Sequence, residues 1–140
     1  MPNNLVPFVA QTAAGLRKQL TVFGNDYPTP DGSCIRDYIH VVDLARAHVV
    51  ALDWLEKRSG SICEVFNLGT GQGNSVLEVL NAFMEETGVK VPYVIGPRRA
   101  GDVTSVYAET NKSREVLGWK CERSLRDGLR DAWKWQQAIT

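Results

Sequence analysis

The sequence lacks the features that define several classes of protein. It has no run of about 18 apolar residues, so no membrane-spanning helix is predicted. No basic segment precedes an apolar stretch at the start, so no secretory signal peptide is expected. The 16 basic and 16 acidic residues give a net charge of zero, which argues against nucleic-acid binding. With 44% hydrophobic and 23% charged residues, the composition favours a globular domain over a disordered chain.

Reactive and metal-binding motifs are also scarce. Cys34, Cys63 and Cys121 form no Cys-x-x-Cys pair and lie far from either histidine. We therefore expect reduced thiols, a cytoplasmic location and no metal site. The sequence has no His-Glu-x-x-His motif, no Ser/His/Asp set and no Tyr-x-x-x-Lys pair. It therefore offers no catalytic residues of these kinds.

The chain is predicted to form one α/β domain, because helix and strand patterns alternate along it. Ser75 with Glu78 and Ser124 with Asp127 resemble capping boxes, and Gly88 and Gly118 suit helix ends. The expected helices are Asn4 to about Lys18, a helix capped by Asp43, Ser75 to about Thr87, Asn111–Leu117 and Leu125–Gln137; the expected strands are Gln19–Phe23, Ile35 to about Val42, Cys63–Leu68 and Val91–Ile95.

A glycine-rich segment, Asn67–Ser75, lies between a predicted strand and a predicted helix, where dinucleotide-binding folds hold phosphates. Its spacing is Gly-x-Gly-x-Gly rather than Gly-x-Gly-x-x-Gly. The next predicted strand ends at Ile95-Gly96 without the acidic residue that would hold a ribose. We therefore interpret the glycines as a tight turn and expect no cofactor-binding residues in this chain.

The apolar segment from Ile35 to Asp43 contains several charged or polar side chains. In a strand, Arg36, Tyr38 and His40 share one face, and Asp37 lies on the other. Such a face can bind a phosphate together with a sugar or a base. Equally, Arg36 can pair with an acid while Tyr38 packs in the core, and spacing alone does not decide between these interpretations.

Three other conspicuous side chains are expected to have packing roles. His48 lies on the apolar stripe of its predicted helix, and Trp133 and Trp135 lie near the end of the chain. Side chains of these types at such positions are most often part of a core. Two acidic residues, Asp37 and Asp43, are likewise expected to support the fold rather than to bind a ligand.

Five segments of the sequence together carry a family resemblance: PNNL at 2–5, FGNDYPTPDG at 23–32, RDYIHV at 36–41, NLGTG at 67–71 and PRRAGD at 97–102. With these segments in this order, the sequence resembles the UDP-glucose 4-epimerases of the extended short-chain dehydrogenase/reductase superfamily along essentially its whole length. The Arg-Asp-Tyr-Ile-His motif is shared by that wider superfamily, and the loop that precedes it narrows the resemblance to the 4-epimerases.

The resemblance implies that residues 1–140 are the smaller, mixed α/β substrate-binding lobe at the C-terminal end of such an enzyme. The Rossmann lobe that binds NAD would precede Met1. The complete enzyme would be a homodimer that interconverts UDP-glucose and UDP-galactose by NAD-dependent oxidation and re-reduction at C4. This chain alone would bind no NAD, would be inactive, and could self-associate through a face left bare. Two alternatives remain open: a free-standing UDP-sugar-binding module, or part of a related nucleotide-sugar dehydratase or decarboxylase.

The resemblance also implies a UDP-sugar site. Val106 occupies the position that bounds the hexose pocket, and because valine is short we expect acceptance of UDP-GlcNAc and UDP-GalNAc as well. The remaining expected contacts are Asn4 and Leu5 near the nucleotide, Thr21 and Phe23 against uracil, Arg36 and Arg99 on the diphosphate with Tyr38 beside Arg36, and Asp102 on the ribose hydroxyls.

Overall fold

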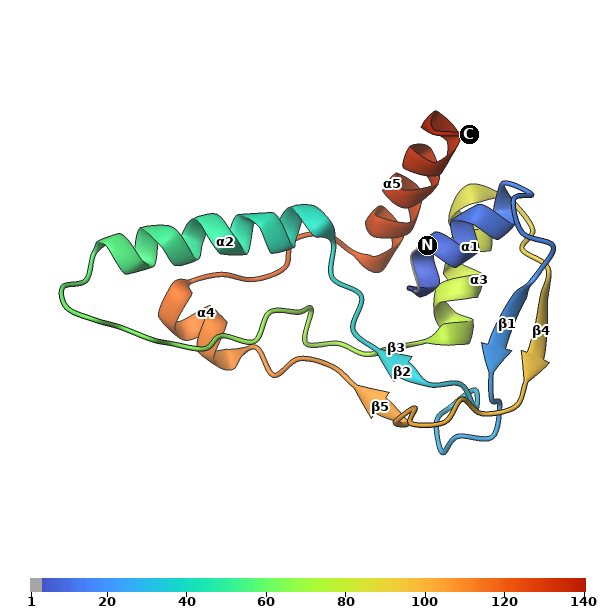
Figure 1. Ribbon diagram of the computed structural model, residues 1–140, viewed down its shortest axis with the longest axis horizontal. Helices are drawn as coiled ribbons and strands as arrows, with labels where there is room; N and C mark the ends of the chain where they lie inside the picture. Colours follow the sequence, from blue (N-terminus) through green and yellow to red (C-terminus); the bar gives the residue numbers. More distant parts are fainter. Residues whose placement is uncertain (1–3) are drawn as a thin grey trace.

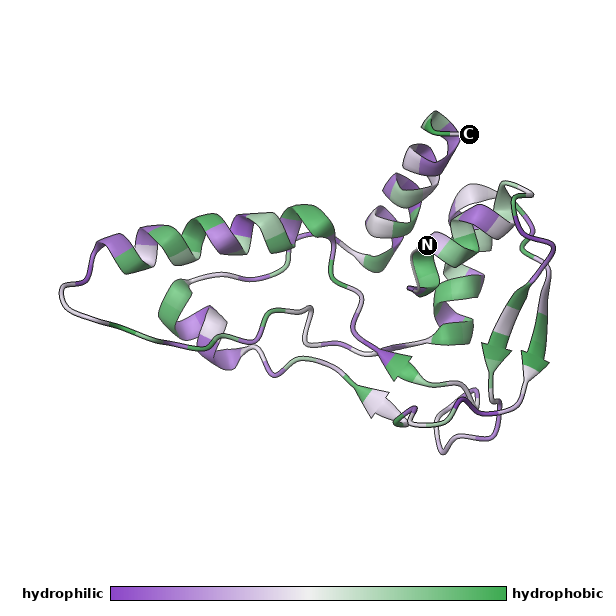
Figure 2. Ribbon diagram, in the orientation of Figure 1, coloured by the Kyte–Doolittle hydropathy of each residue, from purple (hydrophilic) through white to green (hydrophobic). Residues whose placement is uncertain are grey.

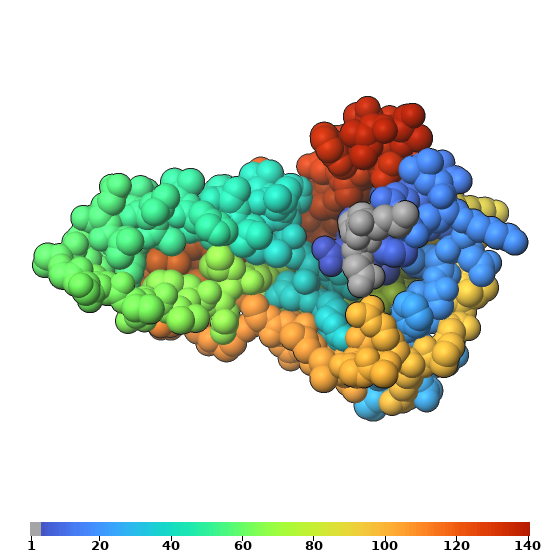
Figure 3. All heavy atoms as spheres, viewed as in Figure 1, coloured from blue at the N-terminus to red at the C-terminus, as the bar shows by residue number. Residues whose placement is uncertain are grey.

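Three helices pack beside a pair of parallel strands at one end of an elongated molecule (Figures 1 and 3). The structure, a computed structural model, describes residues 4–140. Helix α1 contacts both α3 and α5, and in the strand pair Leu20 is in register with Tyr93. These elements are α1 (Leu5–Ala13), α3 (Val76–Thr87), α5 (Leu125–Ala138), β1 (Leu20–Phe23) and β4 (Tyr93–Gly96).

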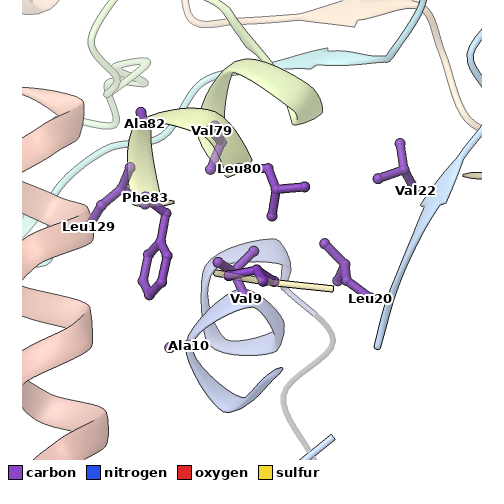
Figure 4. Close-up of a cluster of buried hydrophobic side chains, with 10 residues drawn as sticks. Val9, Ala10, Leu20, Val22, Val79, Leu80, Ala82, Phe83 and Leu129 are labelled. Atoms are coloured by element: carbon purple, nitrogen blue, oxygen red, sulfur yellow. The ribbon is translucent and has the colours of Figure 1, made fainter. Parts of the chain in front are cut away.

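The hydrophobic core lies between these elements. Figure 4 shows side chains of α3 directed toward α1 and β1, with Leu129 of α5 beside them. Val9, Leu80 and Phe83 have no solvent exposure. Burial of each such large apolar side chain stabilises the fold by about 1.5–3 kcal/mol. The core therefore fixes the relative positions of α1, α3, α5 and β1.

A small second sheet connects this core to an extended arm. Strand β2 (Ile35–Arg36) lies between β3 (Asn74–Ser75), which is antiparallel to it, and β5 (Ser105–Val106), which is parallel. The arm contains α2 (Val41–Glu56) and α4 (Asn111–Leu117), which contact each other, and Figure 1 shows it projecting away from the core. None of the helices within residues 4–140 has the length and apolar character needed to cross a membrane.

Four of the predicted helix ends are confirmed. Both capping boxes form, at Ser75 with Glu78 and at Ser124 with Asp127. Gly88 and Gly118 end α3 and α4 in the left-handed conformation. These features could be predicted because each depends on residues that are close together in the sequence.

The strand predicted from Ile35 to about Val42 is too long. Strand β2 ends at Arg36, because its neighbours β3 and β5 each pair with only its two residues. The prediction that Asp43 caps the next helix is also wrong. His40 is the cap, and its Nδ1 accepts a hydrogen bond from the N–H of Val42 at 3.1 Å.

Two other predicted elements differ from the structure by more than two residues. The segment 63–68 pairs with no other described strand, and a strand requires such a partner for its backbone hydrogen bonds. Helix α1 ends at Ala13 rather than near Lys18, since the chain turns at Gly15, where φ is 75°. Both differences depend on contacts or conformations that the residue pattern does not contain.

Asp43 joins the start of α2 to the segment that precedes α5. Its carboxylate is completely buried and accepts hydrogen bonds from the backbone N–H groups of Glu122 and Arg123, at 3.1 and 2.9 Å. The Arg123 guanidinium donates a further bond at 3.0 Å. Burial alone would raise the pKa of Asp43, but these hydrogen bonds and the positive charge outweigh it, so the pKa lies below its usual value of 3.8. Asp43 is therefore structural, as expected, although it is not a cap.

We expect Asp43→Asn to lower the free energy of unfolding by about 2–4 kcal/mol at pH 7, because an amide replaces a buried carboxylate that three donors share. Since the folded pKa is depressed, the carboxylate contributes its full stability above the pKa of the unfolded chain. This contribution is lost as the pH falls through the folded pKa. Urea unfolding should therefore show a smaller difference between the two proteins at pH 3 than at pH 7. Asp53→Asn, at an exposed position of α2, is the control; equal losses for both variants would contradict the role of Asp43.

Candidate functional site

A cavity of about 1090 Å³ lies between α1, α5, β1, the segment that follows β2 and the loop that follows β4. All the site residues predicted from the sequence line it, with the exception of Val106. The residues it brings together are Asn4, Leu5, Thr21, Phe23, Arg36, Tyr38, Arg99 and Asp102.

Arg36 combines the two roles that spacing alone left open. Its Nη1 donates hydrogen bonds to the carbonyl oxygens of Ile35 and Val103, at 2.7 and 2.8 Å. Its Nη2 lies 3.5 Å from Oδ1 of Asp102, a long and loose ion pair. The side chain of Arg36 keeps 29% of its surface exposed and lines the cavity. The guanidinium is therefore held in place and still accessible to an anion.

Tyr38 and His40 form the wall next to Arg36. Tyr38 packs partly against the hydrophobic core, and burial raises the pKa of its hydroxyl to about 12. The hydroxyl is therefore protonated at neutral pH and available as a hydrogen-bond donor. His40 caps α2, and its Nε2 lies 3.5 Å from Oδ2 of Asp131 on α5. His40 thus lies at the junction between two walls of the cavity.

The two arginines of the loop Pro97–Asp102 have different surroundings. Arg99 lines the cavity, and no hydrogen bond or ion pair links its side chain to another described residue. Arg98 is not part of the cavity wall; its Nε donates to Oδ1 of Asp26 at 2.7 Å. Of the pair, only Arg99 presents a free cation to the cavity.

The glycine-rich turn does not form a phosphate cradle. The Asp37 carboxylate accepts hydrogen bonds from the backbone N–H groups of Thr70, at 3.0 and 3.1 Å, and of Gly71, at 3.2 Å. The Thr70 hydroxyl donates to the same carboxylate at 2.6 Å. The N–H groups that a bound phosphate would need are therefore already used. The interpretation of this segment as a structural turn agrees with the structure, and so does the structural role expected for Asp37.

Three positions differ from the expectations stated above. Val106 lies on β5 with 51% of its surface exposed and outside the cavity lining, so its role in bounding a hexose pocket stays a prediction. His48 is exposed rather than packed, and its Nδ1 lies 2.8 Å from the carbonyl oxygen of Leu44 in the same helix. Trp133 packs edge-on against Phe83 as expected, whereas Trp135 is 67% exposed and lines the cavity.

Several lining residues were not anticipated. Cys34 precedes β2 and Val76 begins α3, and both face the cavity. Helix α5 adds Leu125, Ala132 and Trp135. The α5 residues carry no motif, and only the packing of α5 beside α1 brings them to the site. The cavity therefore has an apolar wall as well as its cationic one.

The described residues contain no group of three or more His, Cys, Asp or Glu side chains that could hold a metal ion. The three cysteines are free thiols. What the site offers chemically is two guanidinium groups, the carboxylates of Asp37, Asp102 and Asp131, a protonated phenol and apolar surface. This combination suits an anionic ligand that also carries hydroxyl groups and a flat apolar ring.

Comparison with known proteins shows the family to which this chain belongs. Residues 1–132 match the family model described as GDP-mannose 4,6 dehydratase, and the chain therefore belongs to that family. Its fold matches part of the epimerase fold in solved structures. The chain is 52% identical over 135 residues to a bifunctional UDP-glucose and UDP-xylose 4-epimerase of Arabidopsis thaliana, covering 96% of this chain and 38% of the relative. It is 49% identical over 138 residues to a UDP-glucose 4-epimerase of Bacillus subtilis, covering 99% of this chain and 40% of the relative.

Solved structures give the same result. An epimerase from Stenotrophomonas maltophila with bound NAD and formylated UDP-arabinopyranose is 53% identical, with a TM-score of 0.94, over 99% of this chain and 40% of that one. An epimerase from Bifidobacterium longum in complex with NAD⁺ and UDP is 46% identical, with a TM-score of 0.91, over 98% and 40%. A UDP-Glc/GlcNAc 4-epimerase from Campylobacter jejuni is 38% identical, with a TM-score of 0.87, over 99% and 42%. The particular relatives are thus UDP-glucose 4-epimerases, and the chain spans about 40% of the length of those it matches.

Proposed function

We propose that this chain binds the UDP portion of a UDP-sugar, as part of a UDP-hexose 4-epimerase that interconverts UDP-glucose and UDP-galactose. The observation that carries the proposal is the cavity in which Arg36, Arg99 and Asp102 meet an apolar wall. The ligands of similar structures, UDP and formylated UDP-arabinopyranose, have the matching chemistry.

Each part of UDP has a counterpart in the cavity. Two guanidinium groups, from β2 and from the loop after β4, suit a diphosphate, because each can form paired charged hydrogen bonds with phosphate oxygens. The side chains of Thr21 and Phe23 supply apolar surface for uracil. Asp102 is an acceptor for ribose hydroxyls, since its contact with Arg36 is long enough, at 3.5 Å, to be replaced at little cost.

The glycine turn does not suit the phosphates of NAD, because Asp37 already occupies its backbone N–H groups. We propose that NAD, which the named complexes contain, is held in the whole protein by chain outside residues 4–140. The residues described here would then bind and orient the UDP-sugar, and this chain alone would not catalyse epimerisation.

A second candidate is a non-catalytic UDP-sugar-binding module. It is favoured by the structural use of two ionisable residues of the cavity wall, since Tyr38 packs against the core and His40 caps α2. Both candidates predict UDP binding. They differ in whether the whole protein, loaded with NAD, converts UDP-glucose to UDP-galactose.

We expect calorimetric titration of this chain with millimolar UDP to show binding. Arg99→Ala should weaken UDP binding at least about tenfold, because charged hydrogen bonds to phosphate each contribute about 1.5–3 kcal/mol. Arg114→Ala, which removes an exposed arginine of α4, is the matched control and should leave the affinity unchanged. If titration of the wild-type chain with UDP produces no heat of binding, the proposal that this chain binds UDP is wrong.

Val106 provides a test of sugar specificity in the whole protein. We expect conversion of UDP-GlcNAc as well as UDP-glucose, because valine leaves more room than a bulky aromatic side chain. Val106→Tyr should reduce the conversion of UDP-GlcNAc strongly and that of UDP-glucose little, as measured by coupled assays with both substrates. A wild-type protein that converts UDP-glucose freely but leaves UDP-GlcNAc untouched would contradict the proposal.

The exposed apolar face of α2 predicts self-association of this chain. Val41, Val49, Leu52 and Leu55 are all at least 47% exposed, and Figure 2 shows hydrophobic residues along this helix. A second copy would cover such a face. Sedimentation velocity should show that Leu52→Glu shifts the chain toward the monomer and that Glu56→Gln leaves the association unchanged. A wild-type chain that stays monomeric at all concentrations would contradict this prediction.

A further inference from the structure

Arg98 makes a set of contacts that the proposed function leaves unexplained. Its guanidinium donates to the side chain of Asp26, with Nε 2.7 Å from Oδ1, and also to the Asp26 carbonyl oxygen. The same group lies over the ring of Tyr27, 4.2 Å from the ring centroid. Tyr27 is only 5% exposed, so this ring is a firmly held platform for a side chain at the surface.

Gly24 makes this arrangement possible. A Cβ atom at Gly24 would lie 2.7 Å from Cε2 of Tyr27 and 2.9 Å from Cγ of Arg98, so a larger residue would displace both side chains. The N–H of Gly24 donates to the carbonyl oxygen of Gly96 at 3.0 Å. The turn after β1 and the loop after β4 are therefore closely joined at this point.

The other end of the loop is anchored separately. Arg36 donates to the Val103 carbonyl oxygen at 2.8 Å and lies 3.5 Å from the Asp102 carboxylate. Arg99 lies between the two anchors, faces the cavity and has no side-chain partner among residues 4–140. The loop thus holds its free cation between one anchor at Arg98 and another at Arg36.

We propose that Arg98 is a positioning residue for diphosphate binding: its contacts with Asp26 and Tyr27 hold the loop so that Arg99 faces the phosphates. This inference rests on the proposed binding of UDP. Arg98 itself is outside the cavity lining, so it acts through Arg99 rather than on the ligand.

The ion pair between Arg98 and Asp26 contributes to ligand binding rather than to the global stability of the fold. The side chains of Arg98 and Asp26 are 46% and 70% exposed, and exposed ion pairs contribute little to the free energy of unfolding. A loop that is already ordered, however, does not lose conformational freedom when the ligand binds. The Arg98 hydrogen bond also keeps the pKa of Asp26 below its usual value, so the pair stays ionised at neutral pH.

Two substitutions separate positioning from simple electrostatic attraction. Arg98→Lys keeps the positive charge but loses the planar fork and the stacking on Tyr27. Asp26→Asn removes a negative charge, so attraction of UDP by net charge alone predicts tighter binding, whereas loss of the anchor predicts weaker binding. We expect each variant to weaken UDP binding about three- to tenfold.

The affinities for UDP and for uridine are measured on the full chain by calorimetry and by NMR titration. Because Arg99 is expected to contact only the phosphates, uridine binding should be unchanged in both variants. Arg98→Lys should have no further effect in an Arg99→Ala background, since the residue acts through Arg99. Glu85→Gln, which breaks the exposed pair with Arg126 outside this cavity, is the matched control and should change neither affinity.

Four results would overturn the inference while UDP binding by the wild-type chain persists: unchanged UDP affinity in Arg98→Lys, equal weakening of UDP and uridine, tighter UDP binding by Asp26→Asn, or additive effects of Arg98→Lys and Arg99→Ala. A wild-type chain that binds no UDP would instead contradict the proposed function, and the inference with it. The two failures are therefore distinguishable.

Discussion

The carboxylate of Asp37 holds together three segments that are distant in the sequence. It accepts hydrogen bonds from Thr70 and Gly71 in the glycine turn and, at 3.2 Å, from the N–H of Ala108 after β5. Gly69 has no side chain to block this approach; a Cβ atom there would lie 2.4 Å from Oδ2 of Asp37. Because Asp37 is fixed in this way, the path of the chain beyond β2 is fixed too. The cavity wall on either side of Asp37 depends on that path.

The neighbours of Asp37 show why an apolar segment contains so many charged side chains. Arg36 is held by two carbonyl oxygens, His40 by the start of α2, and Asp43 by backbone N–H groups and a guanidinium. The remote partners Val103, Asp131 and Arg123 come from different parts of the chain, so the segment acts as the junction between the core, the arm and α5. A buried charge without a partner would be costly, and here the partners are what bring the parts of the molecule together.

The sequence predicts features that depend on near neighbours and fails where the partner is remote. Both capping boxes and the glycine helix ends are correct, because they involve residues within three or four positions. The length of β2 depends on how far β3 and β5 extend beside it, and 63–68 forms no strand because no described strand pairs with it. Likewise, the exposure of His48 and Trp135 depends on what packs against their helices. The cavity-lining residues of α5 have no signature in the sequence at all, since only tertiary packing brings them to the cavity.

The two cavity arginines differ in a way that affects how their variants are interpreted. Arg36 holds the Val103 carbonyl oxygen and contacts Asp102, so its removal both frees the loop after β4 and takes a cation away from the cavity. Loss of affinity in an Arg36 variant therefore mixes folding with binding. Arg99 has no side-chain partner in the described part of the chain, so its removal leaves the protein contacts intact. Differences between the two variants then measure how much of the site's affinity comes from a structure that is ordered before the ligand arrives.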